Sequence, residues 1–469
     1  MDYINQIICG DCIEVMKTIP DNSVDAVVTD PPYGLEFMGK NWDKFKVGKN
    51  IAGGNTGKDT PYARSKPAPA FYQLTQVDKL AFQEFNFNWS TEALRVLKPG
   101  GYLLAFGGTR TYHRLVCGIE DAGFEIRDTI MWLYGSGFPK SLDISKAIDK
   151  RAGVEREVTE FKKDISHIER GDSNIKEQKD ETSDSMFTIH KANLLTLPAT
   201  PEAKQWAGWG TALKPACEPI VVARKPLSES TVAENVLKWG TGGIDVDGGR
   251  IGCDLEKEDL ARGRKSDNDT TYFTKKNADI HLYPNNKGRF PANVILDEEA
   301  GAMLDEMSGT LESGTHKKGA KNGSHAAFGK DLSRINDYDI PSNTGGASRF
   351  FYCAKASKGE RNRGCEGLEE KREQISMNKN YMGSDGSLRT KNLSNKNYHP
   401  TVKPLALMKY LIKLVSVKGA IILDPFCGSG TTAMGCKETG RRYIAIDNEK
   451  EYIEIAKCRV RAIPELLFV

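Results

Sequence analysis

Four consecutive residues near the start of the chain could act together on a nucleobase amine: Asp30-Pro31-Pro32-Tyr33, which follow the apolar run 26–29. The lone pair of such an amine is delocalised into its ring, so the nitrogen attacks poorly until acceptors draw its hydrogens out of the ring plane. The Asp30 carboxylate can accept one N–H and the Pro31 carbonyl the other, because the prolines hold the backbone still. Tyr33 offers an aromatic face for an extruded base. These groups suit methyl transfer to an amine of adenine or cytosine.

An ordinary strand-ending turn would use the same residue types, and a second motif decides between the two interpretations. The apolar run 421–424 breaks into a turn that contains Gly428 and Gly430. Glycines there allow close backbone approach to a nucleotide-like ligand. The next apolar run, 443–446, ends on Asp447, at about the spacing of an acid that holds ribose hydroxyls. The lysine of a P-loop is missing, so the pattern favours S-adenosylmethionine over a nucleoside triphosphate.

Together the two motifs resemble those of the beta class of DNA amino-methyltransferases, in which the catalytic tetrapeptide precedes the cofactor-binding segment. The resemblance covers residues 1–145 and 397–463. It implies a Rossmann-like α/β fold, with a seven-stranded, circularly permuted methyltransferase sheet and an inserted target-recognition domain. It also implies S-adenosylmethionine as the cofactor. This interpretation requires that residues from opposite ends of the chain converge near Tyr33.

The resemblance also assigns roles to single residues. Asp11 is similar to the acid that contacts the cofactor adenine, and the segment 399–404 resembles the one that closes over the methionine end of the cofactor. There, a hydroxyl at Thr401 and a cation at Lys403 could hold the methionine carboxylate. The catalytic candidates are Asp30, Pro31, Pro32 and Tyr33. The cofactor-binding candidates are Asp11, Cys12, Asp30, Thr401, Lys403, Asp424, Phe426, Gly428, Ser429, Gly430, Thr431, Thr432 and Asp447.

The middle of the chain differs from both ends in composition. We expect the catalytic domain at residues 1–150 and 397–469, and a linker with the target-recognition insertion at 151–396. The loop 34–69 is long enough to form a lid beside the site. Its Trp42 and Phe45 could touch DNA or pack against the lid. Candidates for phosphate contact in the insertion are Lys287, Arg289, Lys317, Lys318 and Lys321. Single surface charges and core packing are the commoner roles for such lysines and for Trp239, Tyr272 and Tyr283.

Composition limits the class of protein. A chain of 469 residues predicts two folded units. The balance of 66 basic against 63 acidic residues means that a basic surface must be local. No apolar run is long enough to span a bilayer and no signal-peptide pattern begins the chain, so we expect no membrane partner and a cytoplasmic enzyme. Cys9 and Cys12 have the spacing of half a zinc site, but no second pair completes it, and we expect no metal.

The function that the resemblance implies is site-specific methylation of double-stranded DNA, with base flipping. Adenine N6 is the favoured target, because the family's adenine enzymes usually carry Asp or Asn at the position of Asp30 and its cytosine-N4 enzymes usually carry Ser. Cytosine N4 remains open. RNA and protein amino-methyltransferases are less favoured, since they usually carry Asn-Pro-Pro-Tyr after the cofactor motif. An inactive DNA-binding protein would not need both motifs intact. The sequence also leaves open a homodimer, a cognate restriction endonuclease as a separate chain, and the recognition sequence.

Overall fold

The chain forms two compact units, one of residues 1–136, 217–371 and 394–469 and a smaller one of residues 137–216 and 372–393. We call them the sheet unit and the small unit. The structure is a computed structural model that describes residues 3–35, 43, 45, 76–137, 141–161, 194–251, 262–263, 283–284, 288–312, 321–322, 334–335, 344–354, 359–368 and 396–464.

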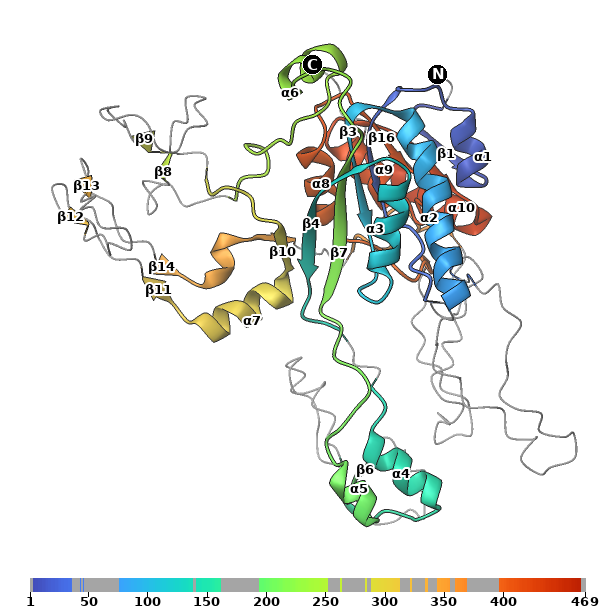
Figure 1. Cartoon of the computed structure of the whole chain (residues 1–469), viewed down its shortest axis with the longest axis vertical. Coiled ribbons are helices and arrows are strands. Elements are labelled where there is room, and N and C mark those ends of the chain that lie inside the picture. The colour runs from blue at the N-terminus through green and yellow to red at the C-terminus, as the bar shows by residue number, and fades with distance from the viewer. Residues whose placement is uncertain are drawn as a thin grey trace, which may run out of the picture. The chain divides into compact units, whose positions relative to one another are not determined.

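One sheet of nine strands organises the sheet unit, in the order β1-β17-β16-β2-β3-β7-β4-β10-β15 (Figure 1). Neighbouring strands are parallel except at β7, which is antiparallel to both β3 and β4. The carboxyl ends of the other strands and the amino end of β7 therefore meet at one edge of the sheet, which we call the functional edge. The strands are β1 (Gln6–Cys9), β2 (Val24–Thr29), β3 (Leu97–Phe106), β4 (Glu125–Leu133), β7 (Cys217–Arg224), β10 (Val294–Asp297), β15 (Tyr352–Ala354), β16 (Ile421–Asp424) and β17 (Arg442–Asp447).

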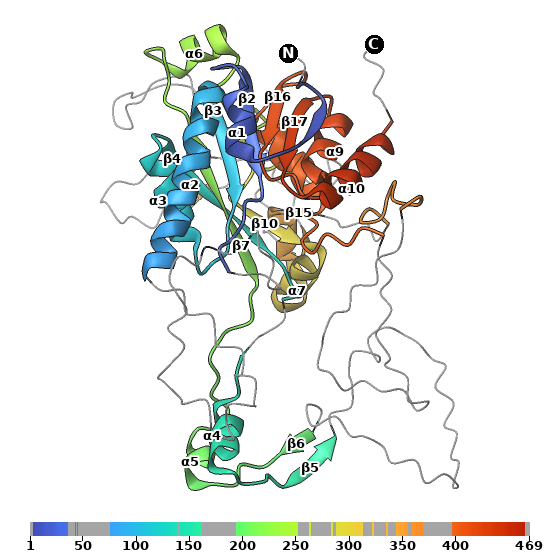
Figure 2. The same ribbon diagram turned by 90° about the vertical axis from the view of Figure 1, so that its right-hand side faces the viewer.

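Helices cover both faces of this sheet (Figure 2). Adjacent strand residues alternate between the two cores, so that Leu103 packs with α1, α2 and α3 whereas Leu104 packs with α8, α9 and α10. Burial on both faces explains why the central strands read as nearly continuous apolar runs. The helices are α1 (Cys12–Lys17), α2 (Gln76–Val96) and α3 (Tyr112–Asp121) on one face, and α8 (Leu405–Leu414), α9 (Thr431–Glu438) and α10 (Lys450–Arg461) on the other.

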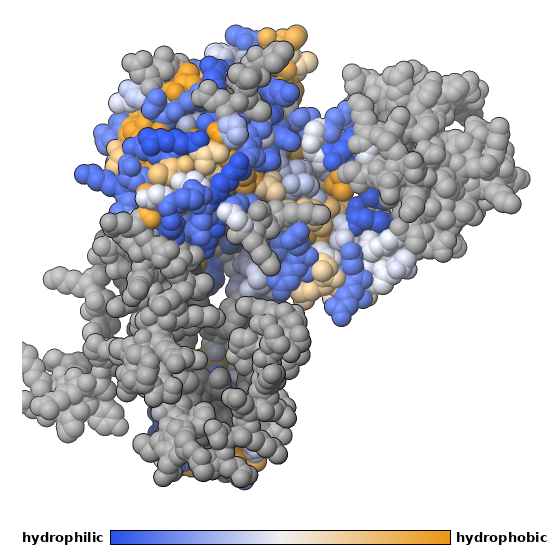
Figure 3. Space-filling view, turned by 180° about the vertical axis from the view of Figure 1, so that it is seen from behind, coloured by the Kyte–Doolittle hydropathy of each residue, from blue (hydrophilic) through white to orange (hydrophobic). Residues whose placement is uncertain are grey.

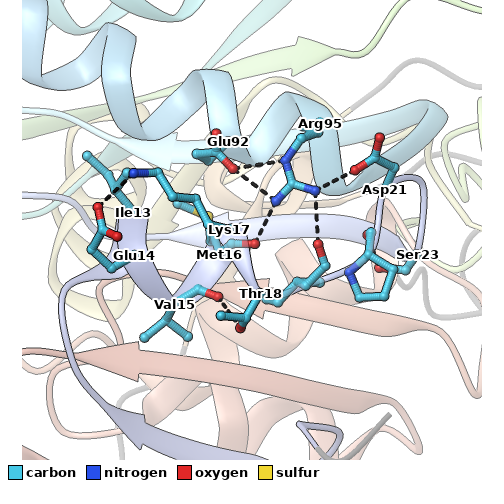
Figure 4. Close-up of polar contacts among 12 residues, drawn as sticks. Ile13, Glu14, Val15, Met16, Lys17, Thr18, Asp21, Ser23, Glu92 and Arg95 are labelled. Carbon is cyan, nitrogen blue, oxygen red and sulfur yellow. Dashed lines mark hydrogen bonds and ion pairs between the residues drawn. The ribbon is translucent and has the colours of Figure 1, made fainter.

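Arg95, in the last turn of α2, fastens the end of α1 (Figure 4). Its guanidinium donates to the main-chain oxygens of Met16, at 2.7 Å, and Ile19, at 2.9 Å. It also pairs with Asp21 and Glu92. Carbonyls at the end of a helix lack their usual donor one turn further on. The Met16 oxygen also accepts the Ile19 N–H, at 2.9 Å, and the arginine adds a charged donor to both oxygens.

The remaining elements of the sheet unit are short. Helix α6 begins with a capping box, in which Thr231 and Glu234 satisfy each other's backbone N–H groups. These elements are α6 (Val232–Trp239), α7 (Glu298–Ser308), η6 (Ala347–Phe350), and the strand pairs β8 (Arg262–Gly263) with β9 (Tyr283–Pro284), β11 (Leu311–Glu312) with β14 (Thr344–Gly345), and β12 (Lys321–Asn322) with β13 (Arg334–Ile335).

The small unit contains α4 (Ile144–Ala152), β5 (Val158–Phe161), β6 (Leu194–Thr196) and α5 (Pro201–Gln205). Asp149 joins its two helices: the buried carboxylate accepts the backbone N–H groups of Ala199 and Thr200, each at 3.0 Å, and the Thr200 hydroxyl at 2.8 Å. The Thr200 hydroxyl in turn accepts the Ala203 N–H at the start of α5. This unit therefore has a polar centre in addition to its few apolar contacts.

The fold confirms the methyltransferase-type sheet and departs from two expectations. The sheet has nine strands, where seven were expected, because β10 and β15 extend it beyond β4. The expected boundaries also differ from the observed ones, since β7, β10 and β15 all come from residues 151–396, which were expected to lie outside the catalytic sheet. Strand β7 belongs to the sheet because its apolar residues need to be covered on both faces: from Pro219 to Arg224 all are buried between β3 and β4.

On the face seen in Figure 3, hydrophilic residues dominate the described surface and hydrophobic ones are interspersed among them. No helix within the ranges that the structure describes is both long enough and apolar enough to span a membrane.

Candidate active site

The two sequence motifs meet at the functional edge. Strands β16 and β2 are parallel neighbours, with Leu423 opposite Val27. One step further along the strands, the Thr29 hydroxyl donates to Asp424 Oδ1 at 2.6 Å, across a sequence separation of 395 residues. The tetrapeptide that begins at Asp30 thus leaves the sheet beside the strand that leads into the glycine turn. The expected convergence of the two ends of the chain is confirmed.

The glycine turn is held from two sides. The N–H of Gly428, whose φ is +49°, donates to Asp447 Oδ2 at 2.8 Å. On the other side a Cβ added to Gly428 would lie 2.5 Å from His399 Nε2, and one added to Gly430 would lie 2.8 Å from the Cβ of Ala456. Both positions therefore require glycine, one for its backbone conformation and close approach and the other for space as well as a φ of +78°.

A buried arginine that the sequence did not single out supports the same turn. Arg459 of α10 is fully buried, and its Nη1 donates to the main-chain oxygen of Ser429 at 2.7 Å, to the Ser429 hydroxyl at 2.9 Å and to the Thr431 hydroxyl at 3.0 Å. Burial lowers the pKa of Arg459 to about 10, which still leaves it charged at neutral pH. Ser429 and Thr431, two of the cofactor-binding candidates, are thus tied to the inside of the protein.

Asp424 is buried at the end of β16 and fixes the start of the turn. Its carboxylate accepts the Thr29 hydroxyl, the Phe426 N–H at 3.1 Å and the Thr432 hydroxyl. Burial raises the pKa of Asp424 to about 6, although these hydrogen bonds oppose the shift and the charge of Asp30 adds to it. The contacts of Asp424 are therefore with the protein's own backbone and hydroxyl groups.

Asp11 and Cys12 lie on the same edge, next to the end of β17. The Gly10 N–H donates to the main-chain oxygen of Asp447 at 2.9 Å. Asp11 caps α1, since its carboxylate accepts the N–H groups of the second and third residues that follow it, at 2.9 and 3.1 Å. Burial raises the pKa of the Cys12 thiol to about 12. The thiol is therefore neutral and inert, and it packs in the core with Met16.

Four side chains form a closed polar cluster around the tetrapeptide: Asp30, Tyr33, Glu218 and Lys403. The Lys403 ammonium lies 2.6 Å from Asp30 Oδ2 and 3.2 Å from Glu218 Oε2. The Tyr33 hydroxyl lies 2.9 Å from Asp30 Oδ1 and 3.0 Å from Glu218 Oε2. Lys403 also donates to the Tyr33 hydroxyl at 3.3 Å, and its ammonium lies 4.9 Å from the ring centre of Phe106.

The charges in this cluster shift one another. Burial raises the pKa of Asp30, Lys403 opposes that shift, and Glu218 adds to it. Burial disfavours the charged form of Lys403, but Asp30 and Glu218 outweigh burial and raise its pKa above the ordinary value. Burial and the two carboxylates raise the pKa of Tyr33 well above its ordinary value. The cluster thus holds a permanent ammonium and a neutral phenol beside Asp30.

The backbone after Tyr33 is also fixed, by residues that the sequence did not single out. The Thr111 hydroxyl donates to the Tyr33 carbonyl at 2.6 Å. The buried Asp43 accepts the N–H groups of Gly34, at 2.6 Å, and Leu35, at 3.1 Å. Phe45, expected in the lid, packs instead against the aromatic rings of Phe82 and Phe85. Trp42 and most of the expected lid lie outside the described residues.

The expected role of Lys403 at the cofactor stays a prediction, and the structure adds two contacts that were not expected. The resemblance placed it over the cofactor's carboxylate, whereas in the structure its ammonium contacts the side chains of Asp30 and Glu218. Thr401, in the same loop, is half-buried. Glu218 itself was missed, because it lies in the range that was expected to be the insertion.

Of the expected phosphate contacts, only Arg289 has a described side chain. Its guanidinium donates to the main-chain oxygen of Arg349 at 2.9 Å and lies 4.9 Å from the ring centre of Phe350. Trp239 is half-buried, and its indole N–H donates to the Ser228 hydroxyl. Only the backbone of Lys321 and Tyr283 is described, and Lys287, Lys317, Lys318 and Tyr272 lie outside the described residues. Within those residues, no group of three or more His, Cys, Asp or Glu side chains could hold a metal ion.

Comparison with known proteins agrees with this geometry. The family model described as DNA methylase, of the N6 and N4 amino-methyltransferases, matches residues 24–458. The chain belongs to this DNA methylase family. The type II methyltransferase M.HindIII of Haemophilus influenzae is 22% identical to this methylase over 464 residues, which are 97% of this chain and 95% of the relative. The type II methyltransferase M2.DpnII of Streptococcus pneumoniae is 52% identical over 64 residues, 14% of this chain and 24% of the relative.

Solved structures of DNA methyltransferases also match the methylase. The PvuII DNA methyltransferase, described as cytosine-N4-specific, matches with a TM-score of 0.41 and 12% identity, over 97% of this chain and 85% of the other. The complex of M1.HpyAVI with S-adenosylmethionine matches with a TM-score of 0.33 and 14% identity, over 97% of this chain and 98% of the other.

Proposed function

We propose that this methylase transfers a methyl group from S-adenosylmethionine to adenine N6 at a specific site in double-stranded DNA, in the cytoplasm, after flipping the target base out of the helix. The observation that carries the proposal is the position of Asp30. Its carboxylate follows β2 directly, next to the strand whose glycine turn would hold the cofactor, and the hydrogen bond from Thr29 to Asp424 joins the two. A methyl donor and an amine acceptor would therefore meet within one site.

The functional edge fits a nucleoside cofactor. Gly428 and Gly430 leave the backbone of the turn open to close approach, and the strands beside it end near two acids, Asp11 and Asp447. Such acids can accept hydrogen bonds from ribose hydroxyls or an adenine amine. Phe426 adds an apolar ring beside the turn, close to Trp89. When bound, S-adenosylmethionine supplies a methyl group made electrophilic by its sulfonium.

The protein's own groups prepare the target amine. Asp30 accepts one amine hydrogen and the Pro31 carbonyl the other, which turns the nitrogen lone pair out of the base plane. Lys403 favours the ionised form of Asp30, and only that form can accept on both carboxylate oxygens. The phenol of Tyr33 stays neutral over the physiological range, so its ring can stack on an uncharged base. Alignment and electrostatics then carry the reaction without a covalent intermediate, and the surplus amine proton leaves to solvent or through Asp30.

Adenine is the proposed base because the first residue of the tetrapeptide is Asp. Cytosine N4 is the second candidate, since the same two acceptors could draw out the hydrogens of its amine. Double-stranded DNA is the proposed partner. The recognition function falls to residues outside the nine-stranded sheet, among them the small unit.

The test is to identify the methylated product. The purified chain is incubated with S-adenosylmethionine that carries a labelled methyl group and with unmethylated duplex DNA, RNA or protein, and each substrate is then digested and separated by mass spectrometry. The proposal predicts labelled N6-methyl-2′-deoxyadenosine from duplex DNA. Labelled N4-methyl-2′-deoxycytidine would establish the second candidate, and label in RNA or protein but not in DNA would overturn both.

A further inference from the structure

Glu218 joins the active-site cluster from a strand that is distant in sequence. It lies near the amino end of β7, and because β7 is antiparallel to its neighbours, this end meets the carboxyl end of β3 at the functional edge. Its carboxylate reaches both the Tyr33 hydroxyl and the Lys403 ammonium. Neither of the two motifs contains it, and the chemistry derived above does not require it.

The Tyr33 hydroxyl has a choice of two acceptors. Its single proton can go to Asp30 Oδ1, at 2.9 Å, or to Glu218 Oε2, at 3.0 Å, but not to both at once. When the Tyr33 hydroxyl donates its hydrogen bond to Asp30, one acceptor position of Asp30 is occupied. When it donates to Glu218 instead, that position on Asp30 is open for an amine hydrogen.

Lys403 is shared in the same way. Its ammonium, with a side chain only 9% exposed, contacts both carboxylates. One positive charge between two negative ones withdraws less electron density from each than it would from a single partner. A nearly buried site strengthens this effect, because water screens the charges poorly there.

We propose that Glu218 is a positioning residue for methyl transfer. It accepts the hydrogen bond of the Tyr33 hydroxyl and shares the Lys403 ammonium with Asp30, and so leaves Asp30 a strong acceptor for the target amine. The inference rests on the proposed function. The charged and titratable groups that face Asp30 are Lys403, Tyr33, Glu218 and Asp424, and those that face Glu218 also include Tyr134 and Cys217.

The direction in which the two neighbours act on Asp30 makes the proposal testable by pH. Glu218 raises the pKa of Asp30 and Lys403 lowers it. Methyl transfer requires ionised Asp30, so its rate falls as the pH drops through that pKa. Glu218→Gln removes a negative charge and should move this fall in rate to lower pH. Lys403→Met removes a positive charge and should move it to higher pH.

The experiment measures single-turnover methyl transfer against pH, with cofactor and DNA affinities measured separately. Glu218→Gln is predicted to be about tenfold slower than wild type, or more, at the pH of maximum rate, because a charged hydrogen-bond partner is lost. Its affinities should be unchanged. The matched control is Glu125→Gln in β4. It breaks the ion pair with Arg224, which lies at the opposite end of β7 from Glu218. It should leave the rate and the pH profile as they are in wild type.

Tyr33→Phe provides a second test, which does not depend on Glu218→Gln alone. Without the hydroxyl the two carboxylates no longer compete for its hydrogen bond. Glu218→Gln should therefore lower the rate of methyl transfer clearly less in the Tyr33→Phe background than in wild type. Equal costs in both backgrounds, or a Glu218→Gln enzyme with the wild-type rate and pH profile, would overturn the inference. A wild-type chain that transfers no methyl group to DNA would instead refute the proposed function.

Discussion

The surroundings of Asp30 act on its ionisation in two opposite directions. Burial and Glu218 favour its protonated form, and Lys403 favours its ionised form. A carboxylate held between such opposing effects is more basic than one in water and can still be ionised at neutral pH. The tetrapeptide predicted the acceptor but could not predict this balance. Lys403 was expected beside the cofactor and Glu218 in another domain. Only the fold shows that Lys403 contacts Asp30 and that Glu218 contacts both Lys403 and Tyr33.

The raised pKa of Asp424 predicts how the stability of the fold depends on pH. Its folded pKa of about 6 lies above the ordinary value of 3.8, so the folded protein retains a proton at pH values where the unfolded chain has released it. This group therefore stabilises the fold fully below about pH 4, and the contribution is lost as the pH rises to about 6. The loss should be about 3 kcal/mol.

Denaturant unfolding at several pH values checks this prediction, with Asp424→Asn as the comparison. The free energy of unfolding of wild type, relative to that of Asp424→Asn, should fall by about 3 kcal/mol in all between about pH 3 and about pH 7 and stay constant above. Parallel curves for the two proteins would show that Asp424 does not titrate in that window.

At the scale of the element, the glycine turn is shaped by contacts from three segments: the loop at His399, the end of β17 and the helix α10. The sequence predicted the turn and the acid at Asp447. It did not reveal Arg459, because an arginine on an amphipathic helix usually faces water. Only packing shows that this arginine points inward, to Ser429 and Thr431.

We predict that Gly428→Ala weakens cofactor binding at least about tenfold, since the new methyl group would meet the His399 ring in addition to the strain of a positive φ. Gly419→Ala is the matched control. Its φ is also positive, at +78°, but its added Cβ has no atom within 4 Å. Calorimetric titration with S-adenosylmethionine should give the wild-type affinity for Gly419→Ala. Equal affinities for both variants would contradict the claim that the space beside His399 requires glycine at position 428.

Helix α1 depends on Arg95 in a similar way. Arg95→Met should lower the free energy of unfolding by about 2–3 kcal/mol, because the carbonyls of Met16 and Ile19 lose a charged donor and the ion pairs with Asp21 and Glu92 are broken. The exposed Arg127, 3.9 Å from Glu125, is the comparison, and its replacement by Met should cost less than about 1 kcal/mol. If urea unfolding gave similar losses for both variants, the capping role of Arg95 would be wrong.

At the scale of the whole molecule, the order of the motifs predicted that the two ends of the chain share one sheet. Parallel strands that carry both motifs must bring their carboxyl ends to the same edge, and β2 and β16 do so as direct neighbours. The sequence could not predict the extent of the sheet. Strands as short as β10 and β15, separated by stretches rich in polar residues, give no periodic signal of their own.

The account depends most on the claim that Asp30, fixed beside the glycine turn, is the acceptor for the target amine. The most direct test is the single-turnover rate of methyl transfer to duplex DNA by Asp30→Ala, with S-adenosylmethionine binding measured in the same preparation. We predict a loss of about a hundredfold or more at a cofactor concentration that saturates the variant. A rate close to that of wild type would contradict the account.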